Sequence, residues 1–250
     1  MIEKFRIISL SIHHLDFNES LEKVTGWAIQ KQPAYICFAN VHMIIEAYKD
    51  KNFLTQVEKA NLVLADGKPV AVACNILHHK KQERIASMDF MPGILEVANE
   101  KKISVFFYGS TPEILKALKE KISKKYPNLI YAGSISPSFG LLSEEEVMKD
   151  IEQINRTGAG LIFVSLGCPK QEKWMAEYST KINGVLLGVG GVFSVMAGLQ
   201  KRAPVWMQKT ALEWLYRLMQ QPRRLASRYF FTNIRFLYLL SREWIKTIAR

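Results

Sequence analysis

The chain has 250 residues, of which 48% are apolar and 23% charged, so it can bury a large core and has the composition of a folded protein. Its three cysteines form no CxxC pair, which argues against a disulfide-stabilised secreted domain and favours a reducing compartment. Charges interrupt the N-terminus, and the longest uncharged run, residues 182–200, contains five glycines, so neither a signal peptide nor a membrane span is predicted.

The net charge of +11 is concentrated at the end of the chain. Residues 201–250 contain eleven Lys/Arg, two acids and nine aromatic residues, whereas residues 1–200 have a net charge of only +2. This shift in composition predicts two parts: a near-neutral body, residues 1–200, and a basic aromatic appendage, residues 201–250.

Short apolar runs that end at Gly, Asn or Asp predict buried strands, and helical segments separate them. The expected strands, in chain order, are residues 5–12, 35–39, 61–65, 103–108, 129–133, 161–166 and 185–187. The expected helices are a first one capped by Asn18 and ending near residue 30, then residues 41–49, a helix after Pro69, residues 112–125, and residues 143–155 with a Ser143–Glu146 capping box. Buried strands alternating with helices are typical of an α/β fold with a mostly parallel sheet.

In such a sheet, ligands bind beyond the carboxyl ends of the strands, where glycine lets the backbone approach closely. Two expected strands end in glycine loops about twenty residues apart, at Gly167-Cys168-Pro169-Lys170-Gln171-Glu172 and at Gly188-Val189-Gly190-Gly191. We therefore expect the active site at these loops.

Two polar residues also stand at strand ends, and each has two interpretations. Asp66 is either a general base in a cleft or the N-cap of the following helix, and spacing alone favours the cap. Asn40 is either a cap or a hydrogen-bonding partner of the substrate.

Several phosphate and cofactor motifs are absent or incomplete. Gly109-Ser110 precedes a helix with Pro112 in its first turn, which is a weak indication of a phosphate site. Phe193 occupies the third glycine position of a dinucleotide fingerprint, so a nicotinamide or flavin enzyme is not predicted. The sequence has no GxxxxGK[ST] loop, Asp-x-Asp pair or HExxH motif, and its histidine pairs, 13–14 and 78–79, are expected at the surface. Phosphate binding would then depend on backbone N–H groups, helix dipoles and Arg/Lys.

The appendage contains a basic amphipathic pattern. Arg228, Arg235 and Arg242 recur every seven residues, and aromatic and aliphatic residues fall away from that stripe. This pattern favours a helix lying on an anionic membrane surface. Packing on the body or on a second subunit is an alternative, and no recognition motif supports nucleic acid as the partner.

The chain also resembles a known family, the WecG/TagA/CpsF glycosyltransferases. The resemblance rests on motifs that follow one another in order along nearly the whole chain: residues 65–69 (ADGKP), 167–174 (GCPKQEKW), 188–191 (GVGG), 202–206 (RAPVW), 212–218 (LEWLYRL) and 221–224 (QPRR).

The resemblance implies a Rossmann-like catalytic domain with a membrane-targeting helical appendage, and inverting transfer from a UDP-sugar to a sugar carried on a polyprenyl diphosphate. It favours Asp66 as the base over the N-cap interpretation, and it implies that Arg217 and Arg224 contact diphosphate. The substrate-binding residues expected with it are Asn40, Arg84, Asp89, Gly109, Ser110, Gly167, Pro169, Gln171, Glu172, Gly190 and Gly191. No metal or other cofactor is expected, because Arg side chains and helix N-termini can stabilise the departing UDP.

Four positions depart from the family pattern, namely Phe38, Ser87, Ser194 and Ser227. These departures leave the sugar open and motivate an alternative, a catalytically degenerate member that acts as a membrane-bound scaffold subunit of a polysaccharide assembly complex. The leading hypothesis is an enzyme peripheral to the cytoplasmic face of the inner membrane, with its oligomeric state left open. A nucleic-acid-binding protein is a distant third, and it would show steeply salt-dependent DNA binding.

Overall fold

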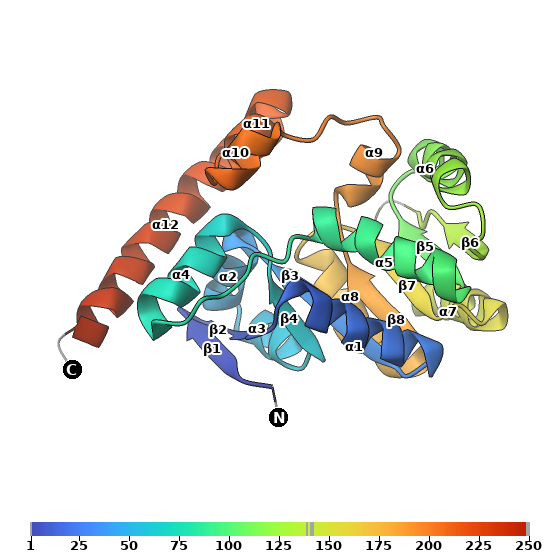
Figure 1. Ribbon diagram of the computed structural model, residues 1–250, viewed down its shortest axis with the longest axis horizontal. Coiled ribbons are helices and arrows are strands. Elements are labelled where there is room, and N and C mark those ends of the chain that lie inside the picture. Colours follow the sequence, from blue (N-terminus) through green and yellow to red (C-terminus); the bar gives the residue numbers. More distant parts are fainter. Residues whose placement is uncertain (1, 139, 141–142, 249–250) are drawn as a thin grey trace. The chain divides into compact units, whose positions relative to one another are not determined.

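The core of the fold is a six-stranded sheet flanked by helices (Figure 1). The structure is a computed structural model that describes residues 2–138, 140 and 143–248. The strand order is β4-β3-β8-β7-β5-β6, and the pairs β3–β8, β8–β7, β7–β5 and β5–β6 are parallel. The strands are β3 (Ala34–Ala39), β4 (Leu62–Ala65), β5 (Val105–Gly109), β6 (Tyr131–Ile135), β7 (Leu161–Ser165) and β8 (Val185–Gly188).

Every residue of β3, β4, β5 and β8 is buried, as expected of parallel strands covered on both faces. The predicted α/β fold with a mostly parallel sheet is therefore confirmed. Strand β6 differs from its predicted bounds, since it starts two residues late and continues through Gly133. A Cβ at Gly133 would lie 2.8 Å from the Phe106 ring, so glycine there extends the strand instead of ending it.

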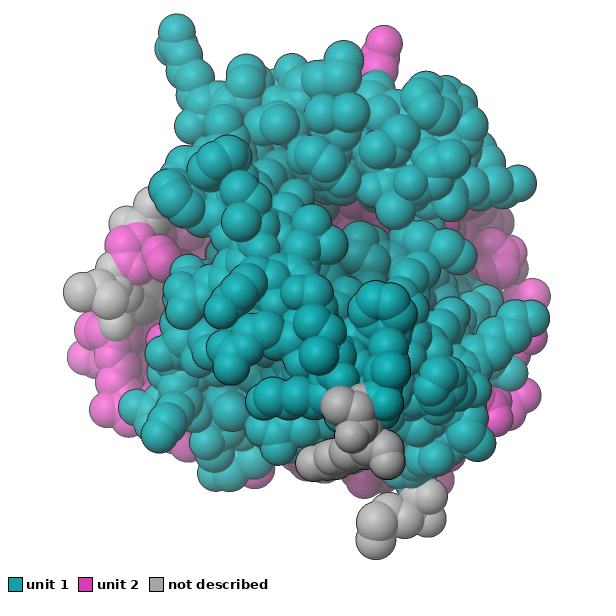
Figure 2. Space-filling view, turned by 90° about the vertical axis from the view of Figure 1, so that its left-hand side faces the viewer, with its two compact units in different colours: residues 1–17, 38–86, 202–250 teal, residues 18–37, 87–201 magenta. Residues whose placement is uncertain are grey.

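The chain divides into two compact units, which Figure 2 colours separately. Unit 1 consists of residues 1–17, 38–86 and 202–250, and unit 2 consists of residues 18–37 and 87–201. Residues 202–250 thus belong to the same unit as residues 1–17 and 38–86 of the predicted body. The division into a catalytic domain and a membrane-targeting appendage stays a prediction.

Unit 2 contains most of the sheet and the helices that precede or follow its strands. These helices are α1 (Phe17–Ile29, with Phe17 in unit 1), α5 (Ser87–Lys101), α6 (Pro112–Lys125), α7 (Glu144–Thr157), α8 (Lys170–Tyr178) and α9 (Val192–Met196), with a short 3₁₀ turn η1 (Ser179–Lys181). The predicted capping box of α7 is present, with Ser143 Oγ accepting from Glu146 N–H and the Glu146 carboxylate accepting from Ser143 N–H. The helix α1 begins one residue before Asn18, because the Glu83 carboxylate accepts the Phe17 N–H and supplies the acceptor expected of Asn18.

Unit 1 begins with a two-stranded antiparallel hairpin, β1 (Lys4–Ile7) and β2 (Leu10–His13), where a single strand over residues 5–12 was predicted. The chain reverses at Ile8, whose φ is 58°. This backbone conformation is unfavourable for a β-branched residue, and the Ile8 N–H donates to Glu243 Oε2 at 2.9 Å. The turn therefore depends on a residue 235 positions away, which no local pattern could reveal.

The same unit contains a set of helices from the middle and the end of the chain. These are α2 (Val41–Lys49), α3 (Lys51–Glu58), α4 (Lys68–His78), α10 (Val205–Lys209), α11 (Glu213–Gln220) and α12 (Pro222–Ile248). Figure 1 shows α12 as one long helix, and it packs against α2 and α4 through a narrow buried face of Leu225, Thr232, Phe236 and Leu239. No helix in the described part of the chain is long and apolar enough to cross a membrane.

Candidate active site

The two predicted polar residues of unit 1 lie at neighbouring strand ends. Asn40 follows β3 and Asp66 follows β4, and the Asp66 N–H donates to the carbonyl of Ala39 at 2.9 Å. This backbone bond fixes the two positions next to each other, and both side chains are half-buried. The structure therefore places Asn40 and Asp66 together at one edge of unit 1.

Asn40 is the N-cap of α2, because its Oδ1 accepts a hydrogen bond from the Met43 N–H at 3.1 Å. The cap interpretation is therefore confirmed for this residue. The cap uses only Oδ1, and the Nδ2 group keeps the chemistry of a donor that a sugar hydroxyl could accept. Contact between Asn40 and a substrate stays a prediction.

Asp66, by contrast, is not the N-cap of the helix that follows it, so the interpretation favoured by spacing is wrong. The N-cap of α4 is Gly67, one residue further on, with a φ of 110°. A Cβ at Gly67 would meet nothing closer than Pro69 Cδ at 3.8 Å, so the backbone conformation selects glycine there, not a lack of space. The sharp turn at Gly67 starts the helix after the carboxylate and leaves Asp66 at the end of the strand.

Arg84 lies near the same edge and forms an ion pair. The Ile85 N–H donates to the carbonyl of Ala65 at 2.8 Å, which holds this segment beside the end of β4. Arg84 Nη2 lies 2.9 Å from Glu213 Oε2 of α11, and the two side chains are only 17% and 22% exposed. Glu213 was not predicted as a site residue, although it belongs to the LEWLYRL motif that carries the resemblance.

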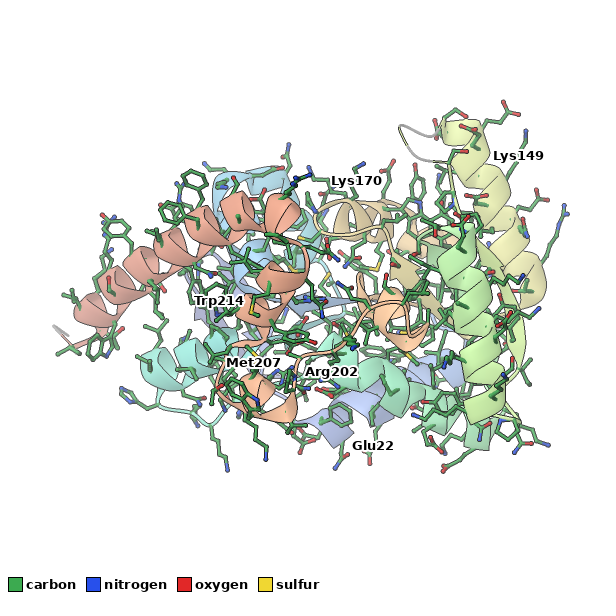
Figure 3. All side chains as sticks on the ribbon, turned by 90° about the horizontal axis from the view of Figure 1, so that it is seen from above. Glu22, Lys149, Lys170, Arg202, Met207 and Trp214 are labelled. Carbon is green, nitrogen blue, oxygen red and sulfur yellow. The ribbon has the colours of Figure 1, made fainter. Side chains whose placement is uncertain are left out.

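The two arginines predicted to bind diphosphate belong to the C-terminal helices of unit 1. Arg217 lies on α11, one turn after Glu213, and is half-buried. Trp214 of the same helix packs edge-on against Tyr229 of α12, with ring centroids 5.8 Å apart, and Figure 3 labels it together with Met207 of α10. Arg224 lies in the first turn of α12, and its side chain is outside the described part of the structure.

In unit 2, the carboxyl ends of β5 and β7 come into close contact. The Ser110 N–H donates to the carbonyl of Ser165 at 3.0 Å, and a Cβ at Gly109 would lie 2.5 Å from the same oxygen. Only glycine fits at this approach, and its φ of 104° also favours glycine. Gly109 and Ser110 thus lie at the same strand ends as the two predicted glycine loops. Asp89, another predicted substrate-binding residue, is exposed in the first turn of α5.

The loops after β7 and β8 are joined to each other. Ser165 Oγ donates to the carbonyl of Gly190 at 2.7 Å. Gly167 and Gly190 have φ values of 80° and 55°, and Gly191 is the N-cap of α9. The structure therefore brings together the predicted loop residues of unit 2, including Pro169 between Gly167 and the start of α8.

Gln171 and Glu172, also predicted to bind substrate, are buried in the first turn of α8, at 5% and 0% exposure. Burial raises the pKa of Glu172 to about 7, and hydrogen bonds from Gln171, its own backbone and Cys168 act in the opposite direction. The sequence offered one signal of this burial, since Gln171, Met175 and Tyr178 fall on one helical face.

The departures from the family pattern have different surroundings. Phe38 is 2% exposed and forms part of the core of unit 1, so no hydroxyl is presented at that position. Ser87 is buried at the start of α5, Ser194 is half-buried in α9, and Ser227 is exposed on α12.

The predicted histidine positions need one correction. His13 is only 4% exposed, and its Nδ1 accepts a hydrogen bond from the Val63 N–H at 2.9 Å, so it is not a surface residue. Over residues 2–138, 140 and 143–248, no group of three or more His, Cys, Asp or Glu side chains could hold a metal ion.

Comparison with known proteins identifies the family. Residues 5–250 match the glycosyl transferase WecG/TagA/CpsF family. The chain is 36% identical over 209 residues to the N-acetylglucosaminyldiphosphoundecaprenol N-acetyl-beta-D-mannosaminyltransferase of Bacillus subtilis (strain 168), a match covering 83% of this chain and 79% of the relative. Two proteins of the same name are each 31% identical to this chain. The match to that of Bacillus spizizenii (strain ATCC 23059 / NRRL B-14472 / W23) covers 85% of this chain and 84% of the relative, and the match to that of Staphylococcus aureus (strain MW2) covers 77% of this chain and 74% of the relative. The resemblance seen in the motifs is thus confirmed, and the chain belongs to the WecG/TagA/CpsF family of glycosyltransferases.

Proposed function

We propose that this glycosyltransferase moves a sugar, of the N-acetylmannosamine or N-acetylmannosaminuronic acid type or another hexose, from a UDP-sugar to a sugar linked to polyprenyl diphosphate. The observation that carries the proposal is the similarity to three N-acetylmannosaminyltransferases over at least 77% of the chain. Their name specifies the sugar transferred and a polyprenyl-diphosphate acceptor. The product would enter the synthesis of teichoic acid, exopolysaccharide or another cell-surface polysaccharide.

The proposed reaction inverts the anomeric carbon in one displacement. The acceptor hydroxyl loses its proton to Asp66 as its oxygen bonds to that carbon, and the bond from the carbon to the UDP oxygen breaks with its electron pair leaving on UDP. Asp66 supports this role because it stands at a strand end outside the N-cap position of α4. Asn40, fixed beside it, would donate a hydrogen bond to a sugar hydroxyl.

The charge on the departing UDP and on the acceptor diphosphate requires compensation. In our proposal the glycine loops of unit 2, with Gly109, Ser110, Gly167, Pro169, Gly190 and Gly191, approach the nucleotide with their backbone. Arg217 and Arg224 would bind the acceptor diphosphate, and Arg84 and Asp89 would contact substrate. No metal is assigned a role.

The first test is a panel of UDP-sugars with a short-chain polyprenyl-diphosphate-GlcNAc or -glucose acceptor, with and without EDTA, in which released UDP is measured. Acceptor-dependent release with one donor would identify the transferred sugar, and release that survives EDTA would support metal independence. Binding of UDP without turnover on any acceptor would contradict an active enzyme and favour the degenerate scaffold subunit.

The base is tested by Asp66→Asn. Loss of the proton acceptor should lower kcat by roughly 10²–10⁴-fold, because general-base catalysis contributes about that much. Asp16→Asn, at an exposed position outside the strand ends, serves as the matched control. Near-full turnover by a folded Asp66→Asn protein would show that Asp66 is not the base.

We also propose that α12 holds the enzyme at the cytoplasmic face of the membrane, where a lipid-linked acceptor resides. The face of α12 opposite its buried residues exposes apolar side chains from Phe230 to Ile248, and the whole helix is about 40 Å long. The exposed set is Phe230, Phe231, Ile234, Leu237, Tyr238, Trp244, Ile245 and Ile248. Arg235 and Arg242 flank this face and complement anionic lipid.

Vesicle sedimentation tests this role of α12. The triple variant Phe231→Ser, Tyr238→Ser, Ile245→Ser removes three residues at heptad spacing that are 58–66% exposed. It should weaken partitioning to phosphatidylglycerol vesicles about tenfold or more. The control changes three exposed apolar residues of unit 2, Ile29, Ile130 and Met148, to Ser. Equal partitioning of the two triple variants would contradict the proposal.

A further inference from the structure

The side chain of Gln171 connects the two glycine loops of unit 2. Its Oε1 accepts the Gly167 N–H at 3.2 Å, from the loop after β7. Its Nε2 donates to the carbonyl of Gly188 at 2.9 Å, at the end of β8. One buried amide therefore spans both loops at which the nucleotide-sugar is expected.

The same Nε2 also donates to Glu172 Oε1 at 2.7 Å. A carboxamide nitrogen carries two hydrogens, and both are now used within the protein. Gln171 is thus unable to donate to a substrate without breaking a buried hydrogen bond. Its geometry is that of a structural link between loops.

Packing around Gln171 is close. A Cβ at Gly188 would lie 2.6 Å from Met175 Cε and 3.1 Å from Gln171 Nε2, and a Cβ at Gly190 would lie 3.4 Å from Gln171 Oε1. The loop after β8 therefore lies directly on the Gln171 amide and the Met175 methyl group, and a side chain at Gly188 would have to displace that methyl group. Any change in the orientation of Gln171 would be transmitted to the backbone of this loop.

We propose that Gln171 and Glu172 are positioning residues that hold the two glycine loops of unit 2 in one geometry, and that neither touches the substrate. Gln171 makes the link, and Glu172, completely buried beside it, fixes the orientation of the amide through the hydrogen bond that Oε1 accepts. Their effect on donor binding rests on the proposed function, which places the nucleotide at these loops.

Glu172 also makes the positioning sensitive to pH. Burial raises its pKa to about 7, so the neutral carboxyl is favoured below neutrality and a buried charge forms above it. The titratable groups that act on Glu172 are the thiols of Cys168, in the loop before α8, and Cys37, on β3. Burial, followed by the Glu172 charge, raises the pKa of Cys37 well above its usual range, so Cys37 stays neutral while Glu172 titrates.

Hydrogen–deuterium exchange of the ligand-free, full-length protein tests the link itself. Gln171→Met keeps the side chain's length and removes its three hydrogen bonds, and exchange should accelerate in peptides covering residues 165–169 and 188–192. The control, Gln153→Met, changes an exposed glutamine on α7 of the same unit. Unchanged exchange in both loops of Gln171→Met would overturn the proposal, whether or not the protein binds UDP.

Binding of UDP separates positioning from direct contact. If the loops hold the nucleotide, Gln171→Met should weaken UDP binding about tenfold, and the loss should accompany the faster exchange. Weaker binding with unchanged exchange would mean that Gln171 contacts the ligand and would overturn the proposal. If wild type binds no UDP while exchange changes as expected, the donor proposal fails and the positioning role stands.

The role of Glu172 is tested by a pH profile of UDP affinity. In wild type the affinity should rise as pH rises through about 7, because the ionised carboxylate accepts the Gln171 hydrogen bond more strongly. Glu172→Gln, which cannot ionise, should lose this increase. Ionisation of the nucleotide phosphate affects the UDP affinity of both proteins equally, so it cancels in the ratio of the two affinities. Superimposable profiles would overturn the role assigned to Glu172.

Discussion

The ion pair between Arg84 and Glu213 gives a glutamate of the C-terminal segment a specific role at the residue scale. The two groups are 129 positions apart in sequence, and each is mostly shielded from solvent. Pairs shielded in this way are screened less than surface pairs, and removing one partner leaves the other without its counter-charge. The pair therefore ties α11 to the segment that follows α4.

Replacing Glu213 by Gln should lower the free energy of unfolding by about 1–2 kcal/mol, since it removes a charge-assisted hydrogen bond from a half-buried site. The measurement is equilibrium urea unfolding. Glu145→Gln breaks a fully exposed pair with Lys149 and should change the free energy by less than about 0.5 kcal/mol. A Glu213→Gln effect as small as that of Glu145→Gln would mean that the pair contributes nothing to stability.

The elements show what could be predicted from the sequence and what could not. Strands β3, β4, β7 and β8 were predicted to within a residue or two, and α2 and α6 with their bounds, because burial on both faces, capping residues and proline leave clear local patterns. The hairpin at Ile8 was missed because its turn is held by Glu243 of α12. Local patterns predict elements that local interactions stabilise, and they fail where the deciding partner is distant in sequence.

The candidate site shows the same contrast between features that local sequence could predict and features that it could not. The glycines at strand ends could be predicted, because a close backbone approach such as that of Gly109 to the Ser165 carbonyl leaves no space for a Cβ. The N-cap interpretation of Asp66, which spacing favoured, was wrong, because an Asp-Gly pair before a helix does not reveal which of the two residues takes the N-cap position. The burial of Glu172 was also missed, because a charged residue in a first helical turn normally faces solvent.

At the scale of the whole molecule, two buried titratable groups make stability depend on pH with opposite signs. Burial, together with the charge of Lys4, lowers the pKa of His13 in unit 1 to about 4. Between pH 4 and 6.5 the unfolded chain therefore binds more protons at this residue, and stability rises with pH. Burial raises the pKa of Glu172 in unit 2 to about 7, so between pH 4.5 and 7 the folded chain binds more protons there and stability falls with pH.

Each contribution amounts to about 3 kcal/mol over its full range, at about 1.4 kcal/mol per pKa unit, and the two oppose each other between pH 4.5 and 6.5. We expect His13→Gln, which keeps an acceptor for the Val63 N–H, to gain stability relative to wild type as pH falls towards 4. Glu172→Gln should gain stability relative to wild type as pH rises towards 7. Urea unfolding between pH 4 and 7.5 measures both differences, and groups common to all three proteins cancel in them. A difference that stays constant with pH would show that the group concerned titrates alike in the folded and unfolded chains, and it would contradict the burial argument for that residue.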